Sequence, residues 1–275
     1  MKRKSIPQLV GSKEPLAMLT AYDCWMASLI DKAGADLILV GDSLGMVIQG
    51  HDNTLSVTVD EMIYHCKAVA RGASNAVIVG DMPYLSYHVS KEDTVRNAGR
   101  IITEGKVDAV KLEGGKKRIP MISALLDAEI PVMGHLGLTP QSVNALGGFK
   151  VQGKNEDSRE RLKEEALALQ DAGVFSLVLE CIPYDLAGEI TDLLTIPTIG
   201  IGAGPHCGGQ VLVTHDLLGL TMGHKPKFVR RFAELGESGG NALESYCQAV
   251  RDGSFPSLSE SYKPNAKPGP FRLYA

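Results

Sequence analysis

A short apolar run that ends near a carboxylate recurs along this chain and restricts the folds that it can adopt. Leu37–Gly45 contains Leu-Ile-Leu-Val followed by Gly-Asp-Ser, and Ala76–Pro83 contains Val-Ile-Val followed by Gly-Asp. Val107–Gly114 and Phe175–Pro183 have a similar form, each with a glutamate at the corresponding point. Continuous apolar runs are typical of parallel strands that are buried on both faces. The repeat therefore predicts an α/β protein with a parallel sheet.

The acidic side chains of these runs are expected to gather at one edge of the sheet. In parallel α/β folds the carboxyl ends of the strands form the edge where ligands bind. Burying several like charges together is costly unless a cation or a positive side chain offsets them. We therefore expect this edge to hold a charged ligand site.

Strand and helix patterns alternate along the chain. The seven or eight expected strands are Leu16–Asp23, Leu37–Gly45, Ala76–Pro83, Val107–Gly114, Ile130–His135, Phe175–Pro183, Pro197–Gly204 and, as the eighth, Gln210–Asp216. The expected helices are Cys24–Lys32, Thr58–Gly72, Ser90–Gly105, Met121–Leu126, Asp157–Asp171, Tyr184–Leu194 and Ala242–Val250. In 275 residues this alternation favours a closed (β/α)8 TIM barrel over an open sheet. We expect residues 1–253 to form one barrel domain and residues 254–275 a C-terminal tail. The polar segments Gln49–Thr54 and Gly137–Lys154 are candidate active-site loops.

Composition and charge argue against several classes of protein. Acidic residues outnumber basic ones by four, and no block of Lys and Arg is interleaved with aromatic residues, which disfavours nucleic-acid binding. No apolar window approaches a membrane span or a signal sequence, so a soluble cytoplasmic protein is expected. The five cysteines lack Cys-x-x-Cys spacing, which disfavours disulfides and structural zinc. Cys181 and Cys207 are interpreted as ordinary thiols.

Three carboxylates at successive strand ends, Asp42, Asp81 and Glu113, form a candidate metal site. A barrel would bring them together, and such hard oxygen ligands suit Mg²⁺ better than zinc. The alternative is that each aspartate caps the helix that follows it, which is a common role for single aspartates. Three in succession weaken that alternative.

Three further residues are candidates for catalysis or substrate binding. Lys111 lies two residues before Glu113, so both side chains are expected on one face of the strand, where the ammonium would neutralise an anion. Glu180 is a candidate general base if it lies close to a substrate proton. His135 could hydrogen-bond a developing oxyanion or be an interior histidine that has its partners.

A competing motif involves Ser43. Gly41–Gly45 satisfies Gly-x-Ser-x-Gly and spells the Gly-Asp-Ser-Leu signature of a family of esterases, which would make Ser43 a nucleophile. No aspartate is followed three positions later by histidine, as those esterases would require, although His206, His215 and His224 could serve an ordinary nucleophile elbow. The glycines of Gly200–Gly204 lack the spacing of a dinucleotide fingerprint and predict a close approach to the backbone.

A dense series of motifs resembles the ketopantoate (3-methyl-2-oxobutanoate) hydroxymethyltransferase family. The series is Thr-Ala-Tyr-Asp23, Val-Gly-Asp-Ser-Leu-Gly-Met46, Gln-Gly-His-Asp52, Val-Lys-Leu-Glu-Gly-Gly115, Gly-His-Leu-Gly-Leu-Thr-Pro-Gln-Ser142, Val-Leu-Glu180, Ile-Gly-Ile-Gly-Ala-Gly204 and Lys-Pro-Lys-Phe228. Together these motifs are far more specific than any one of them. The resemblance implies a phosphoenolpyruvate/pyruvate-type barrel, usually decameric, that makes 2-dehydropantoate for pantothenate and coenzyme A synthesis.

Position by position, the resemblance implies a role for each site residue. Asp42, Asp81 and Glu113 would bind Mg²⁺, and the 2-oxo acid would lie against Asp42, Ser43, Asp81 and Lys111. Glu180 would accept the proton, leaving an enolate that Mg²⁺ stabilises and that attacks the one-carbon unit of 5,10-methylenetetrahydrofolate. Three alternatives stay open at this point: a related Mg-dependent 2-oxo acid lyase, a serine esterase using Ser43, and a barrel that only binds a 2-oxo acid.

Overall fold

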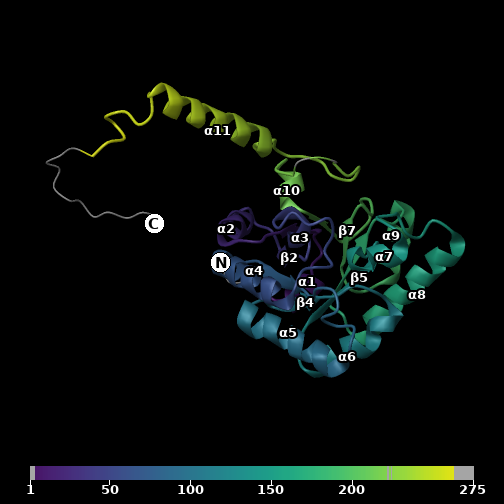
Figure 1. Cartoon of the computed structure of the whole chain (residues 1–275). Helices are drawn as coiled ribbons and strands as arrows, with labels where there is room; N and C mark the ends of the chain where they lie inside the picture. Colours follow the sequence, from purple (N-terminus) through teal and green to yellow (C-terminus); the bar gives the residue numbers. More distant parts are fainter. Residues whose placement is uncertain (1–3, 222, 224, 263–275) are drawn as a thin grey trace.

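The computed structural model describes residues 4–221, 223 and 225–262, and their strands form a closed parallel barrel (Figure 1). Each strand pairs with the next in sequence and the last pairs with the first. The strands are β1 (Leu16–Thr20), β2 (Leu37–Val40), β3 (Val77–Asp81), β4 (Ala109–Lys111), β5 (Val132–Gly137), β6 (Ser176–Glu180), β7 (Thr198–Ile201) and β8 (Gly209–Leu212). The prediction of a (β/α)8 barrel is confirmed, including the eighth strand.

Helices follow most of the strands and cover the barrel. They are α1 (Ile6–Val10), α2 (Cys24–Lys32), α3 (Leu44–Val47), α4 (Val59–Gly72), α5 (Lys91–Gly105), α6 (Ile119–Asp127), α7 (Val143–Leu146), α8 (Glu156–Ala172), α9 (Tyr184–Leu193), α10 (Thr214–Leu217) and α11 (Leu235–Asp252), with 3-10 turns at Lys116–Arg118 and Pro140–Ser142. Capping residues set several of the starts. Thr58 begins α4 in a capping box with Glu61, and the Ser90 hydroxyl accepts from the Asp93 N–H at the start of α5.

Some predicted elements are shorter than expected, and short helices were missed. The second strand ends at Val40 rather than Gly45, because the chain turns there into α3. The seventh ends at Ile201, since Gly202 and Gly204 have positive φ values of 63° and 81°. The residues before β1, where no element was expected, contain α1, whose Leu9 is buried. Helices of one turn carry too little periodicity to be seen in a sequence.

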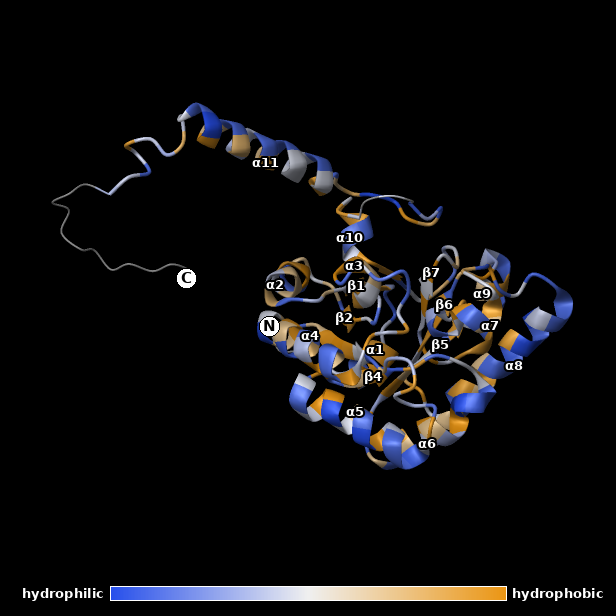
Figure 2. Ribbon diagram, in the orientation of Figure 1, coloured by the Kyte–Doolittle hydropathy of each residue, from blue (hydrophilic) through white to orange (hydrophobic). Residues whose placement is uncertain are grey.

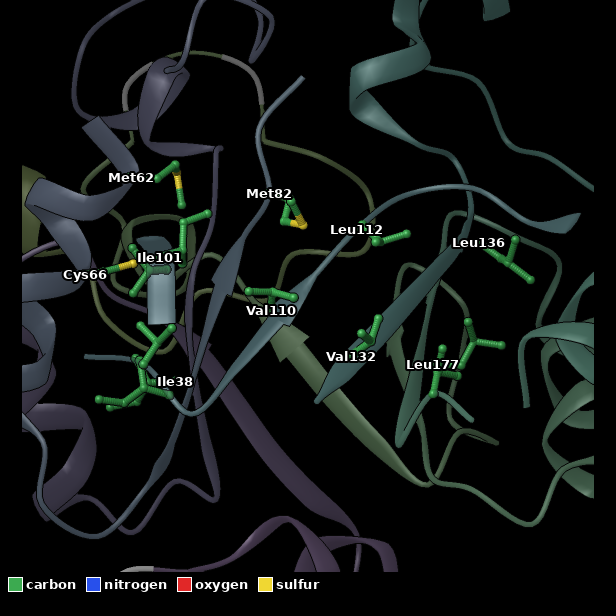
Figure 3. Packing of buried hydrophobic residues seen from close by; sticks show 14 of the residues in the cluster. Ile38, Met62, Cys66, Met82, Ile101, Val110, Leu112, Val132, Leu136 and Leu177 are labelled. Atoms are coloured by element: carbon green, nitrogen blue, oxygen red, sulfur yellow. The ribbon is translucent and has the colours of Figure 1, made fainter. Parts of the chain in front are cut away.

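The apolar side chains form two layers. Alternate strand residues such as Met18, Leu39 and Val79 fill the inside of the barrel. The outward residues pack against the helices, and Figure 3 shows strand residues such as Ile38 and Val110 in one cluster with Met62, Cys66 and Ile101 of α4 and α5. This double burial holds the strand ends in fixed positions around the barrel mouth.

Candidate active site

Six titratable side chains from five consecutive strand units line one cavity at the carboxyl end of the barrel. The cavity has a volume of about 180 Å³. Asp42 lies two residues after β2, and Asp81, Lys111 and Glu180 are the last residues of β3, β4 and β6. Glu113 follows β4 and His135 lies in β5. The structure thus brings all the sequence-predicted site residues, including Ser43, to the lining of one cavity.

The centre of the site is an ion pair between Lys111 and Asp81. The Lys111 ammonium lies 2.9 Å from Asp81 Oδ1, and both side chains are only 4% exposed. Asp81 Oδ2 accepts a hydrogen bond of 3.1 Å from the Asp42 backbone N–H. Burial lowers the pKa of Lys111, but the charges of Asp81 and Glu113 outweigh it, so the net shift of this pKa is upward. Lys111 is therefore a permanent cation in the site.

His135 joins two glutamates. Its Nε2 lies 3.2 Å from Glu180 Oε2, and its Nδ1 lies 3.6 Å from Glu113 Oε1. Burial and the Lys111 charge lower the His135 pKa, but the contacts with Glu113 and Glu180 outweigh them and raise it to about 9. The pKa of Glu113 is lowered overall, because His135 and Lys111 outweigh the effect of burial. The imidazole thus lies between two carboxylates, which favour its protonated form, and its Nδ1 also lies 3.4 Å from the Lys111 ammonium.

Gln141 connects two of the candidate metal ligands, although it is not among the site residues predicted from the sequence. Its side-chain Nε2 donates to Asp42 Oδ2 at 2.8 Å, and its backbone N–H donates to Glu113 Oε2 at 3.0 Å. Its Oε1 accepts from the Tyr87 hydroxyl at 2.6 Å, which fixes the orientation of the amide. Gln141 lies in the expected loop over this edge and within the motif that ends at Ser142, which is the sequence signal that could have identified it.

The carboxylates of the site carry more negative charge than their neighbours offset. Burial and the charges of Asp81 and Glu113 raise the pKa of Asp42 well above its usual range. Burial also raises the pKa of Asp81, although Lys111 opposes the shift. Within the described part of the chain, no three His, Cys, Asp or Glu side chains already converge as a metal site. The donor set nevertheless fits a hard divalent cation, because it supplies buried carboxylate oxygens whose charge lacks full compensation.

Ser43 lines the same cavity but lacks the partner of a catalytic serine. The Tyr22 hydroxyl and Ser43 Oγ are 2.8 Å apart. The rings of His215 and His206 lie against Tyr22 and Tyr184, at centroid distances of 5.7 and 6.2 Å. His224 lies outside the described residues. The part of the chain that the structure describes therefore shows no Ser–His pair at Ser43.

The remaining motifs have packing roles. A Cβ at Gly202 would lie 2.9 Å from the Phe228 ring, and one at Gly204 would lie 2.3 Å from Tyr184 Cβ. The close approach predicted for these glycines is thus made by aromatic side chains of the protein. Both Cys181 and Cys207 are free. Burial raises the pKa of each thiol, to about 12 for Cys181, so neither is an activated thiolate.

Comparison with known proteins gives matches over nearly the whole chain. A family model described as ketopantoate hydroxymethyltransferase matches residues 1–258. A 3-methyl-2-oxobutanoate hydroxymethyltransferase of Syntrophomonas wolfei is 57% identical over 245 residues, which cover 89% of each chain. A protein of the same name from Clostridium botulinum is 57% identical over 252 residues, which cover 92% of each chain. These relatives give no support to the esterase or lyase alternatives.

Solved structures share the fold at much lower identity. A 2,3-dimethylmalate lyase, described as a PEP mutase/isocitrate lyase superfamily member, has a TM-score of 0.62 and 17% identity, covering 94% of this chain and 90% of its own. Phosphonopyruvate hydrolase in complex with oxalate and Mg²⁺ has a TM-score of 0.63 and 12% identity, covering 94% and 93%. At these identities the likeness shows a common barrel fold. No described helix is long and apolar enough to cross a membrane.

Proposed function

This chain belongs to the ketopantoate hydroxymethyltransferase family, and we propose that it performs the reaction of that family at the cavity in the barrel mouth. The family membership makes the chain a hydroxymethyltransferase of pantothenate biosynthesis. The proposed reaction transfers the one-carbon unit of 5,10-methylenetetrahydrofolate to 3-methyl-2-oxobutanoate as a hydroxymethyl group. Water supplies the hydroxyl oxygen, and the products are 2-dehydropantoate and tetrahydrofolate. The single observation that carries the assignment of the site is the convergence of Asp42, Asp81, Lys111, Glu113 and Glu180 on one cavity.

Three carboxylates would hold the metal ion. Asp42, Asp81 and Glu113 are each at most 4% exposed and border the same cavity. Burial and like charges raise the pKa values of Asp42 and Asp81 although Lys111 opposes both shifts, so the site would be stabilised by further positive charge, which a cation such as Mg²⁺ would provide. When bound, a divalent cation polarises a substrate carbonyl and so acidifies the adjacent C–H bond.

The 2-oxo acid would be oriented by groups beside these carboxylates. Lys111 supplies a buried positive charge for the substrate carboxylate or the developing oxyanion, and Ser43 supplies a hydroxyl at the rim. Asp42 and Asp81 flank the same position. A site of these groups selects a small anion that also offers a carbonyl oxygen.

Glu180 is the proposed proton acceptor. It lies across the cavity from β2 and β3, and its side chain is 17% exposed, so it borders the open part of the site. His135 Nε2, 3.2 Å away, holds the Glu180 carboxylate in place. The C3 proton of the substrate would pass to a Glu180 oxygen. The carbon nucleophile that remains would form a C–C bond to the methylene carbon of the folate. Both C–N bonds of that carbon break, water supplies the hydroxyl group, and tetrahydrofolate leaves.

We further propose a cytoplasmic location and a homo-oligomeric state, the decamer that the family resemblance implies. The five cysteines are all free, as is usual in a reducing compartment.

The partners of the site are small molecules. The folate donor follows from the reaction that the relatives are named for.

Solvent exchange of the substrate's C3 proton tests this function. The wild-type chain should exchange the C3 proton of 3-methyl-2-oxobutanoate with D₂O in the presence of Mg²⁺ and without folate, as followed by NMR. Adding 5,10-methylenetetrahydrofolate should yield 2-dehydropantoate, as measured by mass spectrometry. Asp42→Ala should abolish both signals. Exchange that survives chelation of divalent cations, or an ester hydrolysis lost in Ser43→Ala, would contradict the proposal.

A further inference from the structure

The cavity at the barrel mouth has room for only the smaller of the two proposed reactants. Its volume is about 180 Å³, whereas pockets that enclose a drug-sized ligand have volumes of about 300–1,000 Å³. A small 2-oxo acid fits within such a space, but a reduced folate, with its ring systems and glutamate tail, does not. The larger part of the folate must therefore contact residues at the opening of the cavity.

Among the described residues that line the cavity, two have exposed side chains. They are Met46 in α3 and Phe149 in the loop after α7, and their exposed fractions are 40% and 52%. The other lining residues are buried or half-buried. By contrast, the outer helices α5 and α8 carry many hydrophilic residues (Figure 2). Exposed apolar side chains beside a cavity indicate a contact site, and we call this pair the rim of the cavity.

Backbone hydrogen bonds hold Phe149 at the rim. The Gly148 N–H donates to the Val143 carbonyl at 2.9 Å, which ties the loop to the start of α7. The Gln152 N–H donates to the Cys181 carbonyl at 3.0 Å, which ties the loop to the residue after β6. The short segment between these two bonds carries Phe149, so its ring stays beside the cavity although it is exposed. A side chain fixed in this way loses little conformational freedom when a ligand binds.

The proposed reaction brings the rings of the folate to this opening. The transferred carbon of 5,10-methylenetetrahydrofolate is bonded to one nitrogen of the pteridine ring and to the nitrogen that carries the benzoyl ring. Formation of the C–C bond requires this carbon to lie about 3–3.5 Å from C3 of the 2-oxo acid. Glu180, the proposed acceptor of the C3 proton, borders the open part of the cavity. C3 therefore faces the opening, and the rings on either side of the transferred carbon lie against the side chains there.

We propose that Phe149 and Met46 form the binding site for the ring system of the reduced folate. Phe149 offers the flat face of its ring for stacking, and the Met46 thioether offers a polarisable contact at a ring edge. This site rests on the proposed function, because a folate is the second reactant of that function. The two rim side chains recognise the one-carbon carrier, whereas the charged groups inside the cavity bind the 2-oxo acid.

Removal of the ring at position 149 tests the site through a difference between two KM values. Phe149→Leu keeps an apolar side chain but removes the flat ring, so the KM for 5,10-methylenetetrahydrofolate should rise about tenfold or more, as when other aromatic stacking partners are lost. The KM for 3-methyl-2-oxobutanoate, measured in C3 proton exchange without folate, should rise by a much smaller factor. Phe149→Tyr retains the ring and should restore a low KM for the folate.

Val151→Ala is the matched control, because Val151 belongs to the same loop and is 44% exposed but does not line the cavity. It should leave both KM values unchanged. A wild-type KM for the folate in Phe149→Leu would overturn the proposal. An equal rise of both KM values in Phe149→Leu would also overturn it, since Phe149 would then close over the 2-oxo acid. A rise as large in Val151→Ala would do the same, because distortion of the loop would explain both variants.

Binding measurements give a readout that does not depend on turnover. Tetrahydrofolate, titrated by calorimetry into the chain with Mg²⁺ and 3-methyl-2-oxobutanoate present, should bind more weakly to Phe149→Leu and, by a smaller factor, to Met46→Ala. A wild-type chain that fails to exchange the C3 proton would contradict the proposed function itself. A wild-type chain that exchanges this proton and forms product, with both variants binding tetrahydrofolate as tightly as it does, would overturn only the ring site.

Discussion

The two ends of the barrel both bury aspartates, but they supply them with hydrogen-bond donors very differently. At the amino end, Asp31 in α2 accepts backbone N–H bonds from Ser74, Asn75 and Ala76 at 3.1, 2.9 and 2.8 Å. These donors outweigh the effect of burial and lower the pKa of Asp31 to about 2. This carboxylate ties the start of β3 to α2.

At the carboxyl end, Asp42 is in the opposite situation. It accepts from the Gln141 amide but faces the carboxylates of Asp81 and Glu113, and its pKa is raised. The ionised form of Asp31 therefore stabilises the fold, whereas the ionised form of Asp42 opposes it unless a cation is present. The supply of hydrogen-bond donors, rather than burial, therefore separates the structural carboxylate Asp31 from the candidate metal ligand Asp42.

The strongest test removes the charge of Asp42 at the carboxyl end of the barrel. Asp42→Asn should lower kcat/KM by about 10³-fold or more, because it removes a group that organises charge in the transition state. The variant should unfold at the same or a higher urea concentration than wild type, since one of several like charges is gone. The measurements are steady-state kinetics and urea unfolding followed by circular dichroism. A variant that stays active but loses stability would make Asp42 a structural residue like Asp31.

The next test addresses the carboxylate that we assign to proton transfer. Glu180→Gln should reduce C3 proton exchange by about 10²- to 10⁴-fold, as expected for the loss of a general base. Binding of the 2-oxo acid in the presence of Mg²⁺ should change little, as measured by calorimetry. Equal losses of exchange and of binding would instead assign Glu180 to substrate or metal binding.

Replacing Asp31, at the amino end of the barrel, should lower the stability of the fold and leave activity almost unchanged. Asp31→Asn should lower the free energy of unfolding by about 2–3 kcal/mol, because one amide oxygen cannot satisfy the donors that two carboxylate oxygens now serve. Activity of the folded fraction should remain within about twofold of wild type, as its position far from the reacting groups implies. Asp171→Asn, at an exposed position of α8, is the control and should be neutral. An active-site defect in Asp31→Asn would remove the distinction between the two ends.

The Asp31 contribution should also depend on pH. A carboxylate whose folded-state pKa is lowered contributes stability above its unfolded pKa and loses it as the pH falls through the folded value. The pKa of Asp31 is about 2 in the folded chain, against an ordinary value of 3.8. The stability that Asp31 contributes should therefore be lost in the pH range between these two values. The stability difference between wild type and Asp31→Asn should shrink there by about 2 kcal/mol. A difference that stays constant across this pH range would show that Asp31 is not the ionised acceptor.

Whether a residue at either end of the barrel can be predicted from the sequence depends on whether it lies at the end of a buried apolar run. Asp81, Lys111 and Glu180 end buried runs, so the alternation that predicts a strand also predicts their place at the mouth. Gln141 acts through one amide orientation, which depends on a partner 54 positions away, Tyr87. Asp31 reads as a polar residue in a helix, because its donors are backbone groups of a distant turn. Contacts of this kind arise only when the barrel closes.

For the helices, too, the sequence predicts the element but not its contacts. The pattern of Ala242–Val250 predicts a helix, and the structure confirms a helix there with wider bounds, Leu235–Asp252. Periodicity does not say which surface a helix will contact, because any groove of suitable shape would accept an apolar face. The direction of α11 is set by three backbone hydrogen bonds to residues 217–219, which no side-chain pattern records.

The smallest effect is expected from a neutral group at the functional end. Ser43→Ala removes a hydroxyl that lies 2.8 Å from Tyr22 OH and borders the proposed substrate site. The loss of one neutral hydrogen bond is worth about 0.5–1.5 kcal/mol, so kcat/KM should fall by no more than about tenfold, mainly through KM. The measurement is steady-state kinetics at several substrate concentrations, with Mg²⁺ saturating. A loss as large as that of Asp42→Asn would show that the Ser43 hydroxyl takes part in the chemistry. The function of the carboxyl end would then depend on this neutral group as well as on its carboxylates.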